Sequence, residues 1–344
     1  MRIRGSRILD AVRAAVARPT GSVEVLVHLA AEDIAEVNAI IVARMQSPVA
    51  VIPMLADHLI NAGGKRLRPL LTVASARLAG ARDDACLKLA AAVEFIHTAT
   101  LLHDDVVDSS QLRRGKVAAH LIWGAPSSVL VGDFLFAKAF ELMVEAGSMK
   151  ALDILAKAAG VIAEGEVLQL TRAHDLNLSQ DVYLQIIGAK TAELFAAAAE
   201  AGAVSAGAPD HQIQAMRDYA MNLGLAFQLA DDALDYGGAT EALGKNAGDD
   251  FREGKATLPL LLAIARTGAA ETAFWERTIG RTEQTDADFV RAANLIRETG
   301  ALESTLDLAA DFAAKAKTAL SPMTSNSWRT ALEDLADFAV SRRT

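Results

Sequence analysis

Apolar residues recur at intervals of three and four positions over long stretches of the chain. This is the spacing of side chains that share one face of an α-helix. Two examples are Leu87, Ala91, Phe95 and Thr98, and Leu223, Phe227, Ala230 and Leu234. Alternating apolar and polar runs that flank a tight turn, the signal of a β-hairpin, are almost absent. The pattern therefore predicts an all-α fold.

Breaks that contain glycine or proline separate these stretches and delimit about a dozen helices of ordinary length. They lie near residues 19–21, 61–64, 80–83, 109–116, 124–126, 207–209, 237–238, 244–254 and 321–322. No long glycine-, serine- or proline-rich linker lies between the helices, and no fixed period repeats. We therefore expect one continuous all-α domain over residues 1–344, with a core of motifs at residues 63–261.

The composition is that of a large globular protein. Of the 344 residues, 52% are hydrophobic and 22% are charged, which supplies a sizeable core. The formal net charge of -9 argues against a nucleic-acid-binding protein, so any site for an anion must be local. Cys86 is the single cysteine, which fits a reducing compartment and excludes a thiolate metal cluster.

The sequence gives little sign of export or of membrane insertion. Its longest clean apolar run, residues 258–265, is much shorter than the roughly 18 residues of a membrane span. Four arginines lie among the first 13 residues, but no apolar centre of a secretory signal follows them. A transit peptide is the weaker alternative because Asp10 is present and a serine-rich tract is not. We expect a cytoplasmic protein without a transmembrane segment.

An acidic motif closes one apolar helical run. The segment 101–116 reads LLHDDVVDSSQLRRGK and places Asp104, Asp105 and Asp108 in a D-D-x-x-D pattern. Side chains at positions i and i+4 of a helix lie one above the other, so Asp104 and Asp108 can bind one cation, whereas Asp105 lies about 100° around the helix. Carboxylates this close repel one another unless a cation or a proton intervenes. Mg²⁺ suits the site, although a single motif of this kind is more simply explained as a solvated helix end.

A second motif repeats the first. Residues 227–236 read FQLADDALDY, in which Asp231, Asp232 and Asp235 have the same spacing after another apolar run. Two such motifs are hard to explain as coincidence. They are typical of two walls around Mg²⁺ ions that hold a diphosphate.

Basic residues alternate with the aspartate motifs along the chain. They are Lys65, Arg66 and Arg68 in GGKRLRP, Arg113 and Arg114 after the first motif, and Lys245 and Lys255 in GKNAGDDFREGK. Arginine can bind phosphate through two parallel hydrogen bonds, and lysine acts as a point charge. Each residue alone is more simply a surface charge, but their alternation with the aspartates indicates a phosphate-bearing substrate.

Six segments, taken together and in order, resemble those of the trans-polyprenyl diphosphate synthases. They are GGKRLRP (63–69), LLHDDVVDSSQLRRGK (101–116), EGEVLQL (164–170), KTAELF (190–195), FQLADDALDY (227–236) and GKNAGDDFREGKATLPLL (244–261). The resemblance implies an isoprenoid synthase-type helical bundle with a central active-site cavity. It also implies condensation of isopentenyl diphosphate with an allylic diphosphate primer.

The resemblance further implies a role for each matched residue. The two aspartate motifs would bind three Mg²⁺ ions and the allylic diphosphate through Asp104, Asp105, Asp108, Asp231, Asp232 and Asp235. The residues that would contact this diphosphate or polarise its leaving oxygen are Arg113, Lys190, Thr191, Gln228, Lys245 and Lys255. The pocket for isopentenyl diphosphate would contain Lys65, Arg68, His97 and Arg114. Glu166 lies where some relatives carry glutamine, which leaves its role open.

The implied reaction explains these residue types. Cleavage of an allylic C–O bond leaves a carbocation and a diphosphate, so the catalyst must neutralise the leaving group and exclude water. The alkene of isopentenyl diphosphate then attacks the cation, and a proton is lost. The relatives are homodimers, and by analogy we expect a homodimer here.

The resemblance also bears on the length of the product. Ala99 lies five residues before the first aspartate, where the family carries a residue that limits chain length, and Thr100 follows it. Neither side chain is large, so we expect a long all-trans product of octaprenyl or decaprenyl size for a quinone tail, which could be handed to a membrane. Phe95 and Ile96 could instead form a floor, so a medium- or short-chain synthase (geranylgeranyl or farnesyl diphosphate) stays an alternative.

Three other functions fit the sequence less well. A class I terpene cyclase normally has Asn, Ser or Thr, and Glu in its second metal site, in place of the aspartates found here. A phosphohydrolase of the HD type could use His103 beside Asp104, but it needs further histidine ligands at helical positions. A non-catalytic subunit of a heteromeric synthase would be expected to lack aspartates or basic residues that this chain retains.

Overall fold

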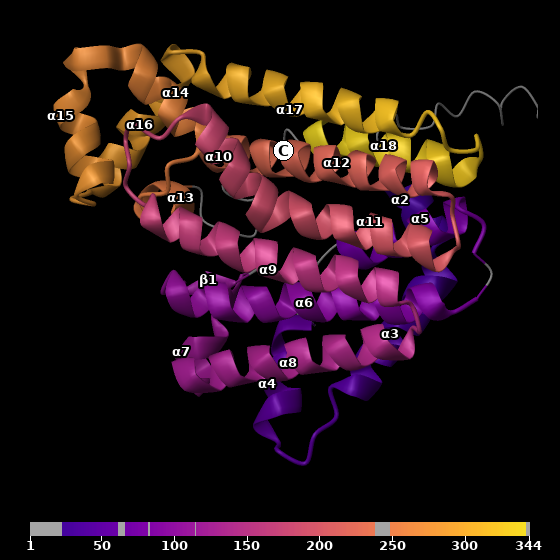
Figure 1. Ribbon diagram of the computed structural model, residues 1–344. Helices are drawn as coiled ribbons and strands as arrows, with labels where there is room; N and C mark the ends of the chain where they lie inside the picture. Colours follow the sequence, from indigo (N-terminus) through magenta and orange to yellow (C-terminus); the bar gives the residue numbers. More distant parts are fainter. Residues whose placement is uncertain (1–22, 61–65, 82, 114, 238–247, 342–344) are drawn as a thin grey trace, which may run out of the picture.

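The computed structural model describes residues 23–60, 66–81, 83–113, 115–237 and 248–341. Its long helices lie side by side with nearly parallel axes, from α17 (Ala301–Ala319) at one face to α8 (Ala125–Glu145) at the other (Figure 1). The strands of the described residues are β1 (Leu112–Arg113) and β2 (Lys116–Val117), which form one antiparallel hairpin. The predicted all-α fold is therefore confirmed.

The remaining helices complete this bundle. They are α2 (Glu24–Leu29), α3 (Ala31–Arg44), α4 (Val51–Ile60), α5 (Leu67–Leu78), α6 (Ala85–Val107), α7 (Ala119–Trp123), α9 (Met149–Thr171), α10 (Gln180–Ile187), α11 (Glu193–Ser205), α12 (Asp210–Gly237), α13 (Asp249–Arg252), α14 (Leu258–Thr267), α15 (Thr272–Trp275), α16 (Asp286–Glu298) and α18 (Ser327–Ser341). Two π-helical turns, η1 (Gly188–Ala192) and η3 (Glu276–Gly280), and the 3₁₀ turn η2 (Gly268–Ala270) lie between them.

The predicted breaks at residues 124–126 and 207–209 lie at helix ends, and local chemistry explains these and other helix ends of the described residues. Gly124 precedes α8 and Gly207 follows α11, both with a positive φ that glycine adopts without strain. The side-chain oxygens of Ser148 and Ser179 accept hydrogen bonds from the first turns of α9 and α10, which satisfies backbone N–H groups there. The helix that begins at each of these points is thus specified by the sequence next to it.

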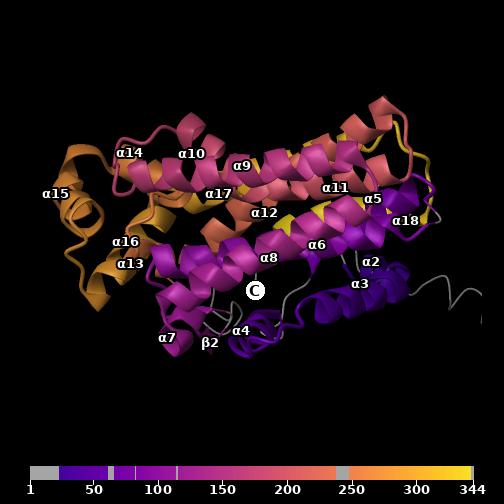
Figure 2. The same ribbon diagram turned by 60° about the horizontal axis from the view of Figure 1, so that its bottom comes forward.

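Helix α6 lies inside the bundle, where it packs against α5, α8, α3 and α11 (Figure 2). Leu87, Ala91, Phe95 and Thr98, the residues whose spacing predicts it, are all buried. Of the described helices, α6 is the one long and apolar enough to cross a membrane by length and composition, and 72% of its apolar window is buried inside the protein. Burial against neighbouring helices accounts for its apolar character.

Helices α14, α15 and α16 lie together at one end of the bundle (Figure 1). Their apolar cluster includes Phe251 of α13, whose ring centroid lies 5.9 Å from that of Phe289 on α16. Gly248, with φ 85°, lies so close to Phe289 that a β-carbon there would approach the ring to 2.5 Å. This contact fixes residues 248–257 at the end of α12, beside the second aspartate motif.

Candidate active site

A cavity of about 430 Å³ lies between α6, α9, α10, η1, α12 and residues 249–257. Its lining includes most of the predicted site residues that the structure describes. These are Arg68, His97, Thr100, Asp104, Asp108, Arg113, Lys190, Thr191, Gln228, Asp231, Asp232, Asp235 and Lys255. Asp105 and Ala99 do not line it, and Lys65, Arg114 and Lys245 lie outside the described residues.

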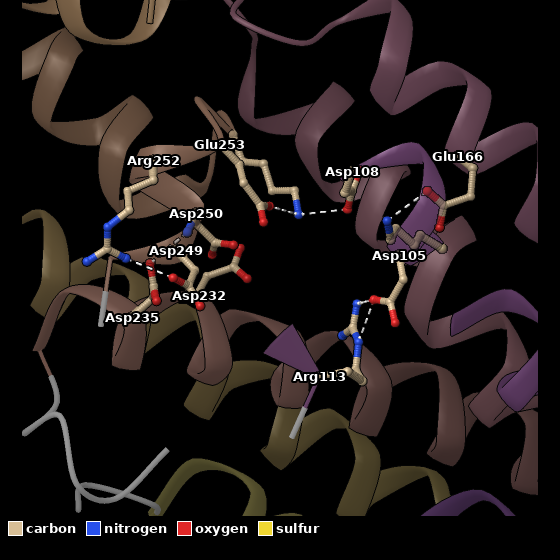
Figure 3. A network of polar contacts seen from close by, with 12 residues as sticks. Asp105, Asp108, Arg113, Glu166, Asp232, Asp235, Asp249, Asp250, Arg252 and Glu253 are labelled. Atoms are coloured by element: carbon tan, nitrogen blue, oxygen red, sulfur yellow. Dashed lines mark hydrogen bonds and ion pairs between the residues drawn. The ribbon is translucent and has the colours of Figure 1, made fainter. Parts of the chain in front are cut away.

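The first motif occupies the end of α6, and its three carboxylates have different surroundings. Asp104 and Asp108 lie one turn apart and both line the cavity. The side chain of Asp105 is only 1% exposed and accepts hydrogen bonds from Arg113, with 2.8 Å from Nε to Oδ1 (Figure 3). The chain turns at Ser109, with φ 53°, and enters the hairpin that brings Arg113 back to α6. Asp105 therefore anchors the hairpin to the helix.

The second motif lies on α12, and the surroundings of its three carboxylates differ from those in the first motif. Asp231 lines the cavity. Asp232 is buried and accepts hydrogen bonds from the hydroxyl of Tyr183 at 2.6 Å and from Nε2 of Gln228 at 2.7 Å. Asp235 accepts bonds from the backbone N–H groups of Gly248 and Asp250, each at 3.1 Å. Two of the three carboxylates therefore bind other parts of the protein.

Two lysines face these carboxylates from opposite sides. Lys190 on η1 donates from Nζ to Glu166 on α9 at 2.7 Å. Lys255, which follows α13, donates to Asp108 at 3.2 Å and pairs with Glu253. Figure 3 shows Glu166 and Asp108 facing Asp250 and Glu253 across the gap between the helices. The cavity thus holds ammonium groups at both walls.

A second polar group lies around α5. Nη1 of Arg68 donates to Nε2 of His97 at 3.1 Å, and its guanidinium lies 4.6 Å from the ring centroid of Phe195. Because a guanidinium can only donate, Nε2 of His97 is the acceptor in this bond. Arg66 precedes α5 in a left-handed conformation, with φ 48°, and its Nη1 binds the buried carboxylate of Glu94 at 2.7 Å. This pair ties the start of α5 to α6.

The carboxylates of the cavity are partly or fully buried and close together, which favours the binding of cations. Burial raises the pKa of Asp104 to about 6, with Glu166 and Asp108 adding to the effect and Lys190 opposing it. Burial and Asp250 likewise raise the pKa of Asp235 to about 7. Burial alone would lower the pKa of Lys255, but the carboxylates around it hold that pKa above its usual range. An additional positive charge would relieve the repulsion between these carboxylates.

Sequence reasoning missed some of the polar residues at this site. Tyr183 was not singled out, although it precedes Lys190 by seven residues, which is two helical turns and places both on one face. Asp250 lies within the segment GKNAGDDFREGK but was not singled out, and its charge adds to burial in raising the pKa of both Asp232 and Asp235. Glu166, whose role was open, is the partner of Lys190.

The residues proposed to set product length differ in position. Thr100 lines the cavity and donates from its hydroxyl to the carbonyl oxygen of His97 at 2.8 Å. Ala99 is fully buried within the main apolar cluster. Any path for a long product past Ala99 would therefore lie deeper than this cavity.

His103 does not form a metal site of the phosphohydrolase type. Its Nε2 donates to the carbonyl oxygen of Val129 at 3.1 Å, and its ring stacks on Phe136 of α8. Among the residues that the structure describes, no three carboxylate, imidazole or thiolate groups converge on one point to hold an ion by themselves.

Comparison with known proteins agrees with this geometry. Residues 49–296 match the Polyprenyl synthetase family. The chain belongs to this family. It is 44% identical to the octaprenyl diphosphate synthase of Escherichia coli over 93% of this chain and 99% of that protein. The chain is therefore a prenyltransferase, as predicted.

Two solved structures of the family are similar to this one. A polyprenyl synthase from Caulobacter crescentus CB15, complexed with calcium and isoprenyl diphosphate, has a TM-score of 0.93 and 75% identity over 95% of this chain and all of that one. A decaprenyl diphosphate synthase from Rhodobacter capsulatus has a TM-score of 0.90 and 51% identity over 94% of this chain and all of that one. The predicted isoprenoid synthase fold is confirmed by these neighbours.

Proposed function

We propose that the protein condenses isopentenyl diphosphate repeatedly with an allylic diphosphate and makes a long all-trans polyprenyl diphosphate. The observation that carries this proposal is the meeting of both aspartate motifs with Lys190 and Lys255 around one cavity. The relatives named octaprenyl and decaprenyl diphosphate synthase support a product of that size.

Mg²⁺ fits the donor set of the cavity. Asp104, Asp108 and Asp231 line it from two facing helices, and each can offer carboxylate oxygens to a hard cation. Because no described cluster holds a cation alone, diphosphate oxygens would complete the coordination. When bound, the ions neutralise the negative charge that grows on the leaving diphosphate. We propose three Mg²⁺ ions held by Asp104, Asp108 and Asp231 together with Asp232 and Asp235, which also line the cavity, while Asp105 anchors the first motif through Arg113.

The other side chains of the cavity bind the two substrates and exclude water. Lys190, Thr191, Arg113, Gln228 and Lys255 bind the allylic diphosphate, and the lysines place positive charge against its leaving oxygen. Arg68 and His97 bind isopentenyl diphosphate, together with Lys65 and Arg114 outside the described residues. Leu101, Ile186, Ile187 and Phe227 give the cavity an apolar wall that keeps water from the carbocation. The departing diphosphate then takes up the proton that the new chain loses.

A long product requires room beyond the cavity, which the small side chains of Ala99 and Thr100 would leave along α6. A geranylgeranyl or farnesyl diphosphate synthase is the second candidate, because Phe95 and Ile96 are buried one turn further along α6. The quinone tail is the use we propose for the product.

We also propose a homodimer of one-domain subunits in the cytoplasm. Helix α8 supports the dimer because Leu130, Phe140 and Val144 are 66%, 45% and 68% exposed, more than a solvated helix surface usually leaves to large apolar residues. In sedimentation, the wild type should have twice the mass of one chain. The variant Val144→Glu should have the mass of one chain. A monomeric wild type would contradict this proposal.

The decisive experiment is incubation of the purified chain with isopentenyl diphosphate, farnesyl diphosphate and Mg²⁺, followed by chromatographic sizing of the products. We expect prenyl chains of about eight to ten units, a range the relatives' names suggest, and no product after chelation of the metal. Formation of cyclised hydrocarbons, release of phosphate without elongation, or no reaction at all would each reject the proposal. Products of only about three or four isoprene units would favour a farnesyl or geranylgeranyl diphosphate synthase.

A further inference from the structure

The helix that carries Lys190 and Thr191 contains a π-helical turn where these two residues lie. It runs through α10, η1 and α11 from Gln180 to Ser205. A π turn closes hydrogen bonds from i to i+5 and is wider than a regular α-helical turn. Neighbouring helices must therefore leave more room for it.

Two glycines provide that room from opposite sides. A β-carbon on Gly165 of α9 would lie 2.7 Å from Cβ of Ala189 and 3.1 Å from the backbone nitrogen of Lys190. A β-carbon on Gly224 of α12 would lie 2.6 Å from Cα and 2.8 Å from Cβ of Ala192. Contacts between carbon atoms are normally about 3.5 to 4.0 Å, so neither helix could carry a side chain there without moving η1.

Backbone conformation does not explain these two glycines. Both lie inside regular α-helices and neither has a positive φ. Glycine inside a helix costs about 0.5 to 1 kcal/mol relative to alanine. Close approach to the π turn is the structural reason that remains.

Each of the two helices also holds a polar side chain of the turn. Glu166, next to Gly165, binds Lys190 at 2.7 Å. Gln228, one helical turn after Gly224, accepts the hydroxyl proton of Thr191 at 2.9 Å. The same two helices thus fix the backbone of η1 by close approach and its side chains by hydrogen bonds.

We propose that Gly165 and Gly224 are positioning residues that set how far η1 reaches into the cavity, and thereby place Lys190 and Thr191 against the allylic diphosphate. This inference rests on the proposed function. An alanine at either position would push η1 by about 1 Å, and a displacement of that size at a reacting centre can cost about 10²-fold in rate. The pocket for isopentenyl diphosphate, around Arg68 and His97, would be left in place by an alanine at Gly165, whereas one at Gly224 would also approach Cβ of Phe195, on whose ring Arg68 lies, to 3.4 Å.

The test compares the variants Gly165→Ala and Gly224→Ala with the wild type. In both we expect the KM for the allylic primer and the dissociation constant for inorganic diphosphate with Mg²⁺ to rise about tenfold or more. The KM for isopentenyl diphosphate should stay within about twofold in Gly165→Ala and change less than that for the primer in Gly224→Ala. Binding of inorganic diphosphate, measured by calorimetry, needs no turnover. It separates this inference from the proposed function, which fails if the wild type does not elongate a primer.

Two further glycines provide matched controls. Gly160 lies on the same helix as Gly165 with nothing within 4 Å of its β-carbon position, so Gly160→Ala should match the wild type. Gly202 lies on α11, ten residues after Ala192, and its β-carbon would clash as severely with another helix, at 2.2 Å from the carbonyl oxygen of Thr72 on α5. Because Thr72 lies one turn after Arg68 on α5, Gly202→Ala should change the KM for isopentenyl diphosphate more than that for the primer.

A second-site change tests the steric cause. Gly165→Ala combined with Ala189→Gly removes the β-carbon that the new side chain would meet, and it should restore most of the diphosphate affinity. Equal changes for both substrates, no change in folded single variants, or no recovery in the double variant would overturn the proposal. So would failure of both single variants to fold while Gly202→Ala folds, because the glycines would then serve the fold alone.

Discussion

The two aspartate motifs share one sequence pattern, yet the structure uses their six carboxylates in different ways. On α6, the first and third aspartates, Asp104 and Asp108, line the cavity, and Asp105 is buried against Arg113. On α12, Asp231 lines the cavity without a described hydrogen bond from another element, whereas Asp232 and Asp235 accept hydrogen bonds from the protein. Figure 3 shows Asp105 and Asp108 of the first motif on one side and Asp232 and Asp235 of the second on the other.

The middle aspartate is the feature that the motifs have in common. In each motif it lies about 100° around the helix from the first aspartate, so it can reach a hydrogen-bond donor on another element. A donor from another element meets it: Arg113 from β1 in one case and Tyr183 from α10 in the other. The motif therefore combines carboxylates that line the cavity with an anchor that holds the helix in place.

The largest expected effect tests the carboxylates that face the cavity. Asp104→Ala and Asp231→Ala should each reduce turnover by about 10³-fold or more, because charge on the leaving diphosphate is no longer neutralised. Steady-state elongation assays measure this. Asp153→Ala is the control, since Asp153 forms an exposed pair with Lys157 on α9. Near-normal turnover in either active-site variant would show that the motifs do not bind the metal.

Replacing the third aspartate of each motif, Asp108 or Asp235, should have different effects on turnover and stability. Asp108→Ala should lower turnover by about 10²-fold with little change in stability, because Asp108 faces the cavity. Asp235→Ala leaves the backbone N–H groups of Gly248 and Asp250 without an acceptor, which should cost roughly 2 kcal/mol in the free energy of unfolding. Urea unfolding and elongation assays on both variants give the comparison. The same profile in both would mean that the motifs are equivalent.

The sequence predicted the pattern but not this division. Helical spacing and the apolar runs were sufficient for the all-α fold, and the motifs were sufficient for the residues that line the cavity. The partners of Asp105, Asp232 and Asp235 on other elements come from 8 to 49 residues away, so these contacts depend on packing that no local pattern encodes. The π turn at Lys190 was not predicted either, because Gly165 and Gly224 that accommodate it lie on other helices.

The residues one turn below the two motifs also differ, and they suggest where the product grows. Four residues before each first aspartate, Thr100 lines the cavity on α6 and the bulkier Phe227 lines it on α12. Ala99→Tyr should shorten products to about three or four isoprene units with the first condensation nearly unaffected, because overpacking there lies away from the metal end. Thr100→Tyr should act in the same direction. Full-length chains from Ala99→Tyr would mean that the path does not pass this residue.

The smallest effect concerns the stability of the ligand-free protein. The folded pKa of Asp104, about 6, exceeds the ordinary value near 3.9, so the folded state binds more protons and stability falls as pH rises from about 4 to about 6. Asparagine does not ionise, so Asp104→Asn should equal the wild type below pH 4 and be more stable at pH 8 by roughly 1 to 3 kcal/mol. Thermal unfolding at the two pH values measures this.

Asp235→Asn should gain less stability at pH 8 despite a folded pKa of about 7 for Asp235. The carboxylate of Asp235 accepts two backbone hydrogen bonds that an amide cannot fully replace. Equal gains in both variants would contradict the distinction between a carboxylate that faces the cavity and one that holds the backbone.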